Sequence, residues 1–433
     1  MYTSMMRKAL FGSGGSGDTA LLSLDFTTST MPTDVTFTRA DTTARATFID
    51  ASGYVKTVTA AGDPRFDYVG GVAKGLLVEA TATNLLQRSN AMNQNPWFET
   101  ANVTRTNFTG GNGPDNVSNS GSKVSAVNIA SGNSLYYNGT TTVPGTTYTY
   151  SVWAKADGAN WIWIQFFYFG VYHGAFFDLS GDGALGNTTG TIVAGSNTIT
   201  KYPNGWFRLT ISHTATYTIF YTGQCPATSN GTGYSSILGQ SPNGVLVYGA
   251  QVEESSSASS YISTTSAALT RLADDAVIRS TAWTSLYAQP GAMVVEFYRG
   301  AYGAGDRSIM STDTTAARHW HLKQANASAT AQIAFSTGSP VTQTGLVSGL
   351  NKVALAWNAP TPTASFDLCV NGATPTFGGS NVGTTLSTWL TLGSQSTTGV
   401  SGTGVWNGYL NNSIKSVKYY TGLTYAEMIA KTT

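Results

Sequence analysis

The amino-acid sequence predicts an all-β protein with a small N-terminal β unit followed by two antiparallel β-sandwiches of the jelly-roll type. Short apolar segments of strand length recur through the 433 residues, separated by glycine, proline and asparagine turns. Only 10% of the residues are charged, against about 25% in an average soluble domain, and 48 residues are glycine. No internal repeat of fixed period is visible, which disfavours a solenoid or a propeller.

The first twenty residues are expected to form a tether outside the folded part of the chain. Met5, Met6, Leu10 and Phe11 precede the glycine and serine run of residues 12–17, and such a run behaves as a flexible joint. The basic residues at the start are not followed by the apolar stretch of roughly 7–15 residues that a cleaved secretion signal needs. We therefore expect the four apolar side chains to anchor the chain to a larger particle.

Residues 21–89 are expected to form the small β unit. The runs at 21–26 and 35–38 are rich in apolar and β-branched residues, and prolines and paired glycines break the pattern between such runs. The one helix expected in this part of the chain is short and covers residues 80–90.

Residues 90–269 are expected to form the first sandwich. Apolar and polar residues alternate with a period of two at 148–153, and residues 206–211 and 245–248 are further strand-like runs. Many short strands separated by turn signals are typical of a β-sandwich or jelly roll. A serine-rich bridge at 254–260 leads to the next boundary, near residue 270.

Residues 270–433 are expected to form the second sandwich, with strands that include 291–298 and 414–420. Near the end of the chain, Thr424 precedes a short helical pattern. Glu427 stands three residues after it, the spacing of a capping box. We therefore expect a short C-terminal helix that begins after Thr424.

Charge and cysteine content exclude several classes of partner. The formal net charge is +1 and no block of lysine or arginine occurs, so nucleic acid is not an expected partner. No stretch approaches the roughly 18–20 apolar residues of a membrane-spanning helix, so membrane insertion is not expected. Cys225 and Cys369 lie far apart and are expected to be buried and unpaired.

No catalytic site is expected. A glycan-cleaving enzyme needs two carboxylates at roughly 5–9.5 Å, one acting as acid and the other as base or nucleophile. The glutamates of this chain are scattered along the sequence: Glu79, Glu99, Glu253, Glu254, Glu296 and Glu427. Neither an H-E-x-x-H zinc motif nor a G-x-S-x-G nucleophile motif occurs. We expect no enzyme activity, no cofactor and no metal ion.

The aromatic segment at residues 161–169 is the sharpest feature of the sequence. In a strand its odd positions place Trp161, Trp163, Phe167 and Phe169 on one face, and its even positions are also apolar. Something must therefore cover the second face: a neighbouring subunit, another domain or a glycan, unless the strand lies deeper in the core. We expect subunit or domain packing, and hence a homo-oligomer, with a glycan platform as the alternative.

Five tryptophans are the candidate carbohydrate-binding residues. Trp153 shares its predicted strand face with polar residues, which predicts partial exposure. Trp206 follows a Pro-Asn-Gly turn and Trp320 stands between two histidines, so each is placed either at the rim of a site or in the core at a strand end. Trp161 and Trp163 of the aromatic segment complete the set.

Several short motifs, taken in order, resemble a recurrent pattern of bacteriophage virion fibre and head-spike proteins. In such proteins two blocks of motifs flank a carbohydrate-binding-module-like jelly roll, here with the runs at 148–155 and 204–208. The matching motifs are residues 64–68, 74–80, 83–86, 248–254 and 260–265.

The last third of the chain is similar to laminin-G/concanavalin-like sandwiches. The similarity is carried by residues 355–358, 367–372 and 408–410. Several members of this fold bind calcium through acidic loops, but this chain has only the scattered Asp306 and Asp313. Calcium is therefore not assigned.

The resemblance to phage proteins implies a structural virion appendage, either a head spike or a tail fibre, displayed on the virion surface and released by lysis. It implies a homotrimer that attaches to other virion proteins through its N-terminus and binds host surface glycans during adsorption. The alternatives are a decoration protein that binds nothing outside the particle and a polysaccharide depolymerase tailspike. The implied organisation is a tether at 1–20, a β unit at 21–89, a jelly roll at 90–269 and a sandwich at 270–433.

Overall fold

The computed structural model shows a protein built almost entirely of β-strands, as predicted from the sequence. The described residues are 20–126, 134–234, 242–279, 286, 290–300, 306–312, 320–325, 328–335, 339–357, 363–382, 389–394 and 409–433. Apart from Ala20, the expected tether lies outside the described residues, and so do its anchor residues Met5, Met6, Leu10 and Phe11. No helix in the described part of the chain is long and apolar enough to cross a membrane.

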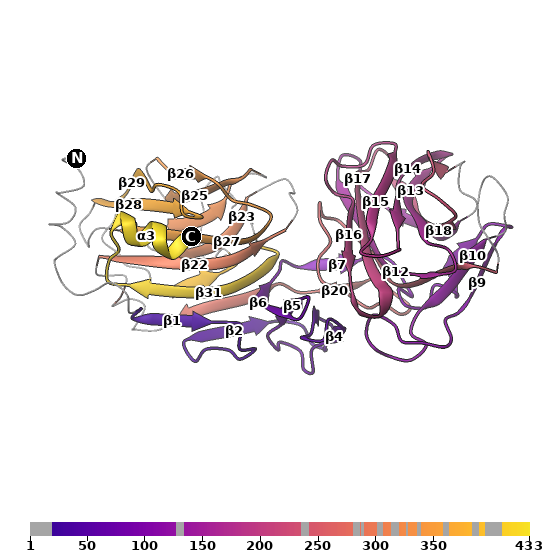
Figure 1. Cartoon of the computed structure of the whole chain (residues 1–433), viewed down its shortest axis with the longest axis horizontal. Coiled ribbons are helices and arrows are strands. Elements are labelled where there is room, and N and C mark those ends of the chain that lie inside the picture. Colours follow the sequence, from indigo (N-terminus) through magenta and orange to yellow (C-terminus); the bar gives the residue numbers. More distant parts are fainter. Residues whose placement is uncertain are drawn as a thin grey trace.

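Two β-sandwiches lie side by side along the longest axis of the molecule (Figure 1). The first is a jelly roll formed by two six-stranded antiparallel sheets, and the second is a larger sandwich formed by an eight-stranded and a seven-stranded sheet, here called the C-terminal sandwich. A two-stranded ribbon of β7 (Ala82–Asn84) and β20 (Leu269–Arg271) joins them at the start and end of the jelly roll. The expected helix at residues 80–90 is therefore wrong, because this segment pairs with a distant strand.

The jelly roll consists of the β13 sheet and the β12 sheet. The β13 sheet contains, in spatial order, β15 (Ala184–Thr189), β14 (Val171–Asp178), β13 (Trp161–Tyr168), β18 (Ile219–Ala227), β11 (Leu135–Thr141) and β8 (Trp97–Glu99). The β12 sheet contains β16 (Thr198–Lys201), β17 (Trp206–Thr214), β12 (Thr147–Asp157), β19 (Gly244–Glu253), β10 (Ser122–Ala126) and β9 (Val103–Asn107). The inner faces of the two sheets enclose one apolar core, to which Tyr150, Val152, Ile162 and Ile164 belong.

The C-terminal sandwich consists of the β22 sheet and the β23 sheet. The β22 sheet contains β29 (Thr376–Val382), β28 (Thr363–Val370), β27 (Gly349–Trp357), β22 (Gly291–Arg299), β31 (Asn412–Tyr420), β6 (Val72–Val78) and β5 (Phe66–Val69), with β1 (Leu22–Asp25) also paired to β31. The β23 sheet contains β2 (Val35–Arg39), β21 (Asp274–Arg279), β30 (Trp389–Leu392), β23 (Arg307–Thr312), β24 (Trp320–Gln324), β25 (Thr330–Phe335) and β26 (Val341–Thr344). A second apolar core lies between these sheets.

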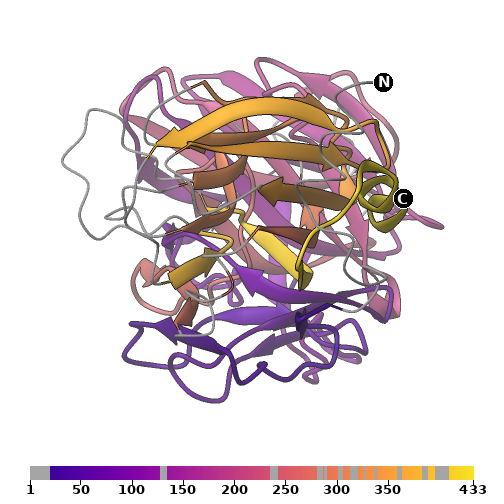
Figure 2. The same ribbon diagram turned by 90° about the vertical axis from the view of Figure 1, so that its left-hand side faces the viewer.

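The N-terminal strands are not a separate unit, contrary to the small domain expected at residues 21–89. β1 and β6 pair with β31, and β2 pairs with β21, so these strands complete both sheets of the C-terminal sandwich. Figure 2 shows them in indigo and purple along one edge of that sandwich. The hairpin of β3 (Thr47–Ile49) and β4 (Val55–Thr57) packs instead beside the jelly roll, where Val55 joins a small apolar cluster with Trp153 and Trp206. The N-terminal segment therefore contacts both sandwiches.

A cluster of buried charged residues, here called the ionic hub, lies where these pieces meet. Its members are Arg39, Asp41, Arg65, Glu79, Arg271 and Asp274. Arg65 donates to Glu79 Oε2 at 2.6 Å and to Asp274, and Arg39 donates to Asp274 at 3.0 Å. Burial opposes ionisation of Glu79, but Arg271 and Arg65 outweigh it and lower the pKa of this carboxyl to about 2. The hub thus keeps the Glu79 carboxyl ionised inside the protein.

The expected C-terminal helix is confirmed as α3 (Tyr425–Thr432). Thr424 caps it, since its hydroxyl accepts from the Glu427 backbone N–H while the Glu427 carboxylate accepts from Thr424 N at 2.7 Å. The expectation for the two cysteines is also confirmed: Cys225 and Cys369 are buried and free.

Candidate binding face

The β13 sheet turns one face inward and the other outward. On the inner side, the Phe166 ring lies 6.3 Å from that of Tyr150 on β12, between ring centroids, and Tyr150 donates a hydrogen bond to Gln224. Since successive residues of a strand point to opposite faces, the odd-numbered residues of β13 lie on the outer face. They are Trp161, Trp163, Gln165 and Phe167.

Strand register gathers aromatic side chains from five strands on this outer face. Cross-strand pairing aligns one row across β8, β11, β18, β13 and β14, made of Phe98, Tyr136, Gly223, Gln165 and Gly174. The neighbouring row on β18, β13 and β14 is made of Tyr221, Phe167 and Tyr172. We call the five ring-bearing residues of these rows the outer aromatic face: Phe98, Tyr136, Phe167, Tyr172 and Tyr221.

The rings of the outer aromatic face form one continuous, half-exposed surface. The Phe167 ring stacks on Tyr221 with centroids 5.0 Å apart and on Tyr172 at 5.7 Å, and it meets Tyr136 edge to face at 5.7 Å. Phe98 stacks on Tyr136 at 6.1 Å and is 36% exposed. Tyrosine presents an apolar ring and a polar hydroxyl, so the surface suits a ligand that is itself both apolar and hydroxylated.

Gln165 places a polar group within the first of these rows, directly beside Phe167 of the second along the outer face of β13. Its Oε1 accepts a hydrogen bond from Trp163 Nε1 at 2.7 Å, whereas its buried Nε2 has no partner among the residues described. Its cross-strand neighbours are Gly174 and Gly223, which have no side chains to satisfy it. A buried amide left without a partner costs about 1–3 kcal/mol, so the Gln165 Nε2 group is a source of instability in this sheet.

The segment at 228–234 covers the remainder of the outer face. Asn187 N donates to Asn230 Oδ1 at 2.8 Å, Thr189 Oγ1 donates to Thr232 O at 3.0 Å, and the Tyr234 ring stacks on Tyr172 with centroids 3.9 Å apart. This part of the surface is therefore shielded by the chain itself.

Of the two candidate tryptophans on β13, only Trp161 is partly exposed. Trp163 is fully buried and its ring centroid lies 4.6 Å from that of Phe176. The prediction that Trp163 belongs to a glycan platform is therefore wrong. Trp163 is a core residue, which is one of the alternatives that the sequence left open. Trp161 lies on the same outer face and is only partly buried.

Trp153 is buried, contrary to the partial exposure expected from its polar strand face. Arg208 lies over its ring at 4.5 Å, and Tyr261 meets it edge to face at 5.5 Å. The polar residues of the same face are also covered, because Thr149 Oγ1 donates to Ser255 O at 2.7 Å and Arg208 donates to Ser259 O at 2.7 Å. The serine-rich bridge is thus not a free linker but a cover over the β12 sheet.

Trp206 and Trp320 are core residues, so the rim positions considered for them are wrong. Trp206 is fully buried, and its Nε1 donates to Asn112 O at 3.0 Å. Trp320 is fully buried within the core of the C-terminal sandwich. Both tryptophans lie in strands and pack inside the fold, as in the core alternative that the sequence left open for them.

The sequence did not point to four of the five residues of the outer aromatic face: Phe98, Tyr136, Tyr172 and Tyr221. They lie on four separate strands, and only the pairing of those strands brings them together. A signal was present in the alternation within each strand, but register between distant strands cannot be obtained from one sequence.

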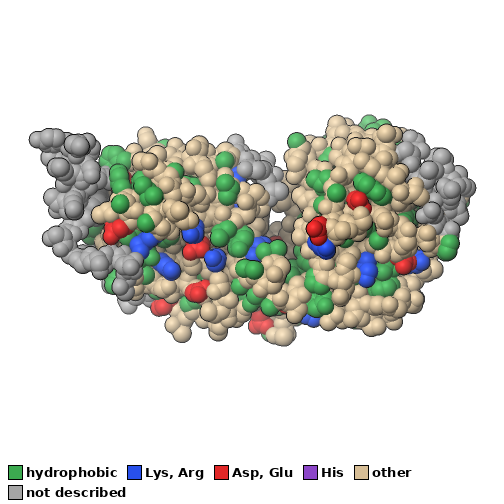
Figure 3. All heavy atoms as spheres, viewed as in Figure 1, with side chains coloured by type: hydrophobic (Ala, Val, Ile, Leu, Met, Phe, Trp, Pro, Cys, Tyr) green, Lys and Arg blue, Asp and Glu red, His purple; other side chains and the backbone are tan. Residues whose placement is uncertain are grey.

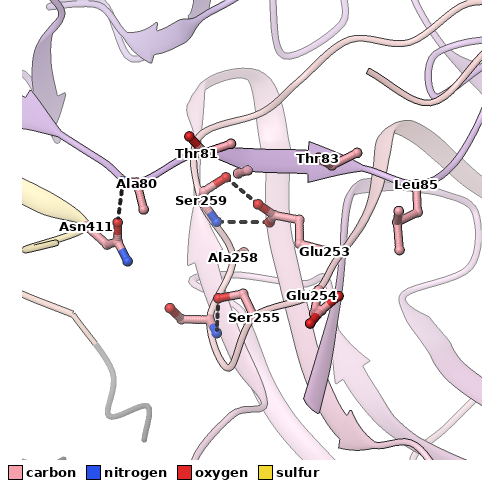
Figure 4. A pocket seen from close by; sticks show the side chains of 12 residues that line it. Ala80, Thr81, Thr83, Leu85, Glu253, Glu254, Ser255, Ala258, Ser259 and Asn411 are labelled. Atoms are coloured by element: carbon pink, nitrogen blue, oxygen red, sulfur yellow. Dashed lines mark hydrogen bonds between the residues drawn. The ribbon is translucent and has the colours of Figure 1, made fainter. Parts of the chain in front are cut away.

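A pocket beside β7 contains a buried carboxyl group that already has hydrogen-bond partners within the protein. The cavity of about 380 Å³ lies between residues 80–85 and the segment 253–259 (Figure 4). The Glu253 carboxylate accepts from both the backbone N–H, at 3.0 Å, and the hydroxyl of Ser259, and burial raises the pKa of this carboxyl. Glu79 is likewise held by Arg65 and Ser260. Both glutamates are therefore hydrogen-bonded to neighbouring groups of the protein.

Metal-ligating side chains do not gather in the described part of the chain, where no group of three or more histidines, cysteines or acids is close enough to hold an ion. His173 and His213 do stack, with ring centroids 4.1 Å apart, but their Nδ1 atoms both face Thr191. This pair is accounted for by contacts within the jelly roll.

Comparisons with known proteins return solved structures only, since no protein-family model and no curated protein matches the chain. The CBM40 of a Ruminococcus gnavus IT-sialidase is 18% identical and covers 35% of this chain and 87% of its own, with a TM-score of 0.27. Domains LG4-5 of the mouse laminin alpha1 chain are 9% identical and cover 74% and 88%, with a TM-score of 0.22. Similarity of this degree assigns no ligand, activity or origin to this chain.

Proposed function

We propose that this chain is a carbohydrate-binding structural protein and that glycans bind on the outer aromatic face of the jelly roll. The single observation that carries the proposal is the continuous surface of five half-exposed rings brought together from five strands. Contiguous apolar surface on a soluble protein marks an interaction site. Apart from Tyr172, on which the Tyr234 ring stacks, these rings are not enclosed by the described part of the chain, unlike Trp163 beside them.

The chemistry of this surface fits a sugar better than a purely apolar ligand. One side of a pyranose ring exposes C–H groups that pack against aromatic carbon, and its hydroxyls need hydrogen-bond partners. Tyr136, Tyr172 and Tyr221 each bring both an apolar ring and a phenolic hydroxyl to the face. Binding through a few such contacts is weak for one chain.

The finer proposal is a phage appendage that binds host glycans during adsorption. It is supported by the ordered motifs that resemble virion fibre and head-spike proteins and by the apolar residues ahead of the glycine and serine run. In a trimer three weak sites act together, so avidity raises the overall affinity by about 10²–10⁴. No bond is made or broken in this function.

The test is a glycan array probed with the full chain, combined with a reducing-sugar release assay on each bound glycan. We expect binding without release. Phe167→Ala should weaken binding at least tenfold, whereas the control Phe377→Ala removes a 60% exposed ring from the C-terminal sandwich and should leave binding unchanged. Release of sugar would support the depolymerase instead, and absence of both would support a decoration protein.

A further inference from the structure

A second polar cleft lies between the two sandwiches, away from the outer aromatic face. It has a volume of about 350 Å³ and is lined on one side by β16 and β17 and on the other by the ends of β22, β23 and β31. Figure 3 shows the notch between the two halves in which the sandwiches face each other. A cleft of this volume matches the small-molecule sites of other proteins, which range over about 300–1,000 Å³.

The cleft is lined by cationic and neutral polar groups. Arg208 and Arg307 contribute two guanidinium groups, and Thr200, Ser348 and Asn412 are among the residues that contribute hydroxyl and amide groups. None of the described residues that line it is acidic. An opening with positive charge and many hydroxyl partners favours an anion that also carries hydroxyls.

Arg307 has no counter-ion among the residues that the structure describes. It makes no hydrogen bond or ion pair with the described residues, and the adjacent Asp306 is paired with Lys323 at 2.5 Å instead. Burial lowers the pKa of the Arg307 guanidinium, and the positive charge of the neighbouring Arg299 lowers it further, because both disfavour the charged form. A partly buried charge without a partner is costly, and an anion from outside would relieve that cost.

Arg208 is held in place from the other side of the cleft. Its Nη2 donates to Ser151 Oγ at 3.1 Å and to Ser259 O at 2.7 Å, and the guanidinium lies over the Trp153 ring. These contacts are to neutral groups, so its positive charge is not neutralised by a direct ion pair within the described residues, and its Nε has no partner there. Arg208 is thus a fixed cation facing the same cleft as Arg307.

We infer that this cleft binds an acidic sugar, with its carboxylate on Arg307 and its hydroxyls on the surrounding threonine, serine and asparagine side chains. The inference rests on the proposed glycan binding and adds a substrate class: a glycan that contains carboxylated residues. Guanidinium pairs with carboxylate through two parallel hydrogen bonds, a geometry that lysine cannot reproduce.

The test compares two ligands that differ only at one carbon, methyl β-glucuronide and methyl β-glucoside, titrated into the full chain and followed by ligand-observed NMR. We expect the glucuronide to bind at least tenfold more tightly. Arg307→Gln should abolish that preference. The control Arg45→Gln removes the same charge from a partly buried arginine whose hydrogen bonds go to Thr43 and Thr270, outside the cleft, and should retain the preference.

Several results would overturn the inference. The first is equal affinity of the natural chain for the glucuronide and the glucoside, a result that needs no variant. The second is a preference for the glucuronide that survives Arg307→Gln. The third is tight binding of inorganic phosphate without binding of the glucuronide. The experiment also separates this inference from the proposal for the outer aromatic face. Phe167→Ala should reduce the binding of neutral glycans on the array, while the preference for the glucuronide remains. Loss of the preference in Phe167→Ala would contradict two separate sites.

Discussion

Removing Arg65 from the ionic hub should destabilise the protein strongly. The side chain is fully buried and donates to four groups: Thr47 O at 3.0 Å, Glu79 Oε2 at 2.6 Å, Ser260 Oγ at 2.6 Å and the Asp274 carboxylate. Arg65→Met preserves most of the volume but removes every one of these donors. Glu79 and Asp274 would remain buried with less positive charge around them.

The structure sets the expected magnitude. Each hydrogen bond to a charged group contributes about 1.5–3 kcal/mol, so the two carboxylates alone give roughly 3–6 kcal/mol. Arg39 at 3.0 Å from Asp274 and Arg271 at 3.4 Å from Glu79 remain and compensate in part. We therefore expect a loss of about 3 kcal/mol in the free energy of unfolding, at the lower end of the range for breaking a buried pair.

Urea unfolding followed by tryptophan fluorescence measures this loss. The matched control is Lys201→Met, which breaks an ion pair of 2.8 Å between Lys201 and Asp182, whose side chains are 48% and 96% exposed. It should change the free energy of unfolding far less than Arg65→Met does, since water and salt screen such exposed pairs. Adding Glu79→Gln to Arg65→Met should recover part of the loss, because it removes the excess negative charge that the loss of Arg65 leaves in the hub. A loss under about 1 kcal/mol for Arg65→Met would refute this account of the hub.

Two further predictions concern the jelly roll. Burial, and to a lesser extent the neighbouring His213, lower the pKa of His173 to about 4, below its ordinary value of 6.5. Between these two pH values the unfolded chain binds more protons than the folded one, so stability falls as the pH drops from 6.5 towards 4. His173→Gln should reduce this slope in urea midpoints, and an unchanged slope would contradict the assignment. Gly174→Ala should lower the free energy of unfolding by about 1–3 kcal/mol, because a Cβ there would clash with the Trp163 ring and lie 2.5 Å from Ile164 O. An unchanged urea midpoint would show that the strand can shift.

The architecture was predictable because it depends on local patterns. Period-two alternation marks a strand wherever it occurs, and the Thr424 and Glu427 spacing marks a helix start, so the all-β class and the C-terminal helix follow from short stretches of sequence. The helix expected at residues 80–90 failed because β7 gains its backbone hydrogen bonds from β20, which lies nearly 190 residues later. Partners at that distance leave no local signal.

The candidate site was less predictable for the same reason. Tryptophan content drew attention to Trp153, Trp163 and Trp206, but large apolar side chains are most often core residues, and here they are buried. The serine-rich bridge, which looks like a linker by composition, instead receives hydrogen bonds from the polar side chains beside Trp153. The half-exposed surface is made of residues such as Tyr136 and Tyr221, whose importance comes from pairing between strands.

Hydroxyl-radical footprinting of the full chain with and without a bound glycan tests the central claim most directly, because oxidation reports the exposure of individual rings. We expect a glycan selected on the array to protect Tyr136, Phe167 and Tyr221, while the exposed Phe377 on the other sandwich is oxidised equally in both samples. Saturating glycan that leaves the three rings of the outer aromatic face as reactive as before would contradict it.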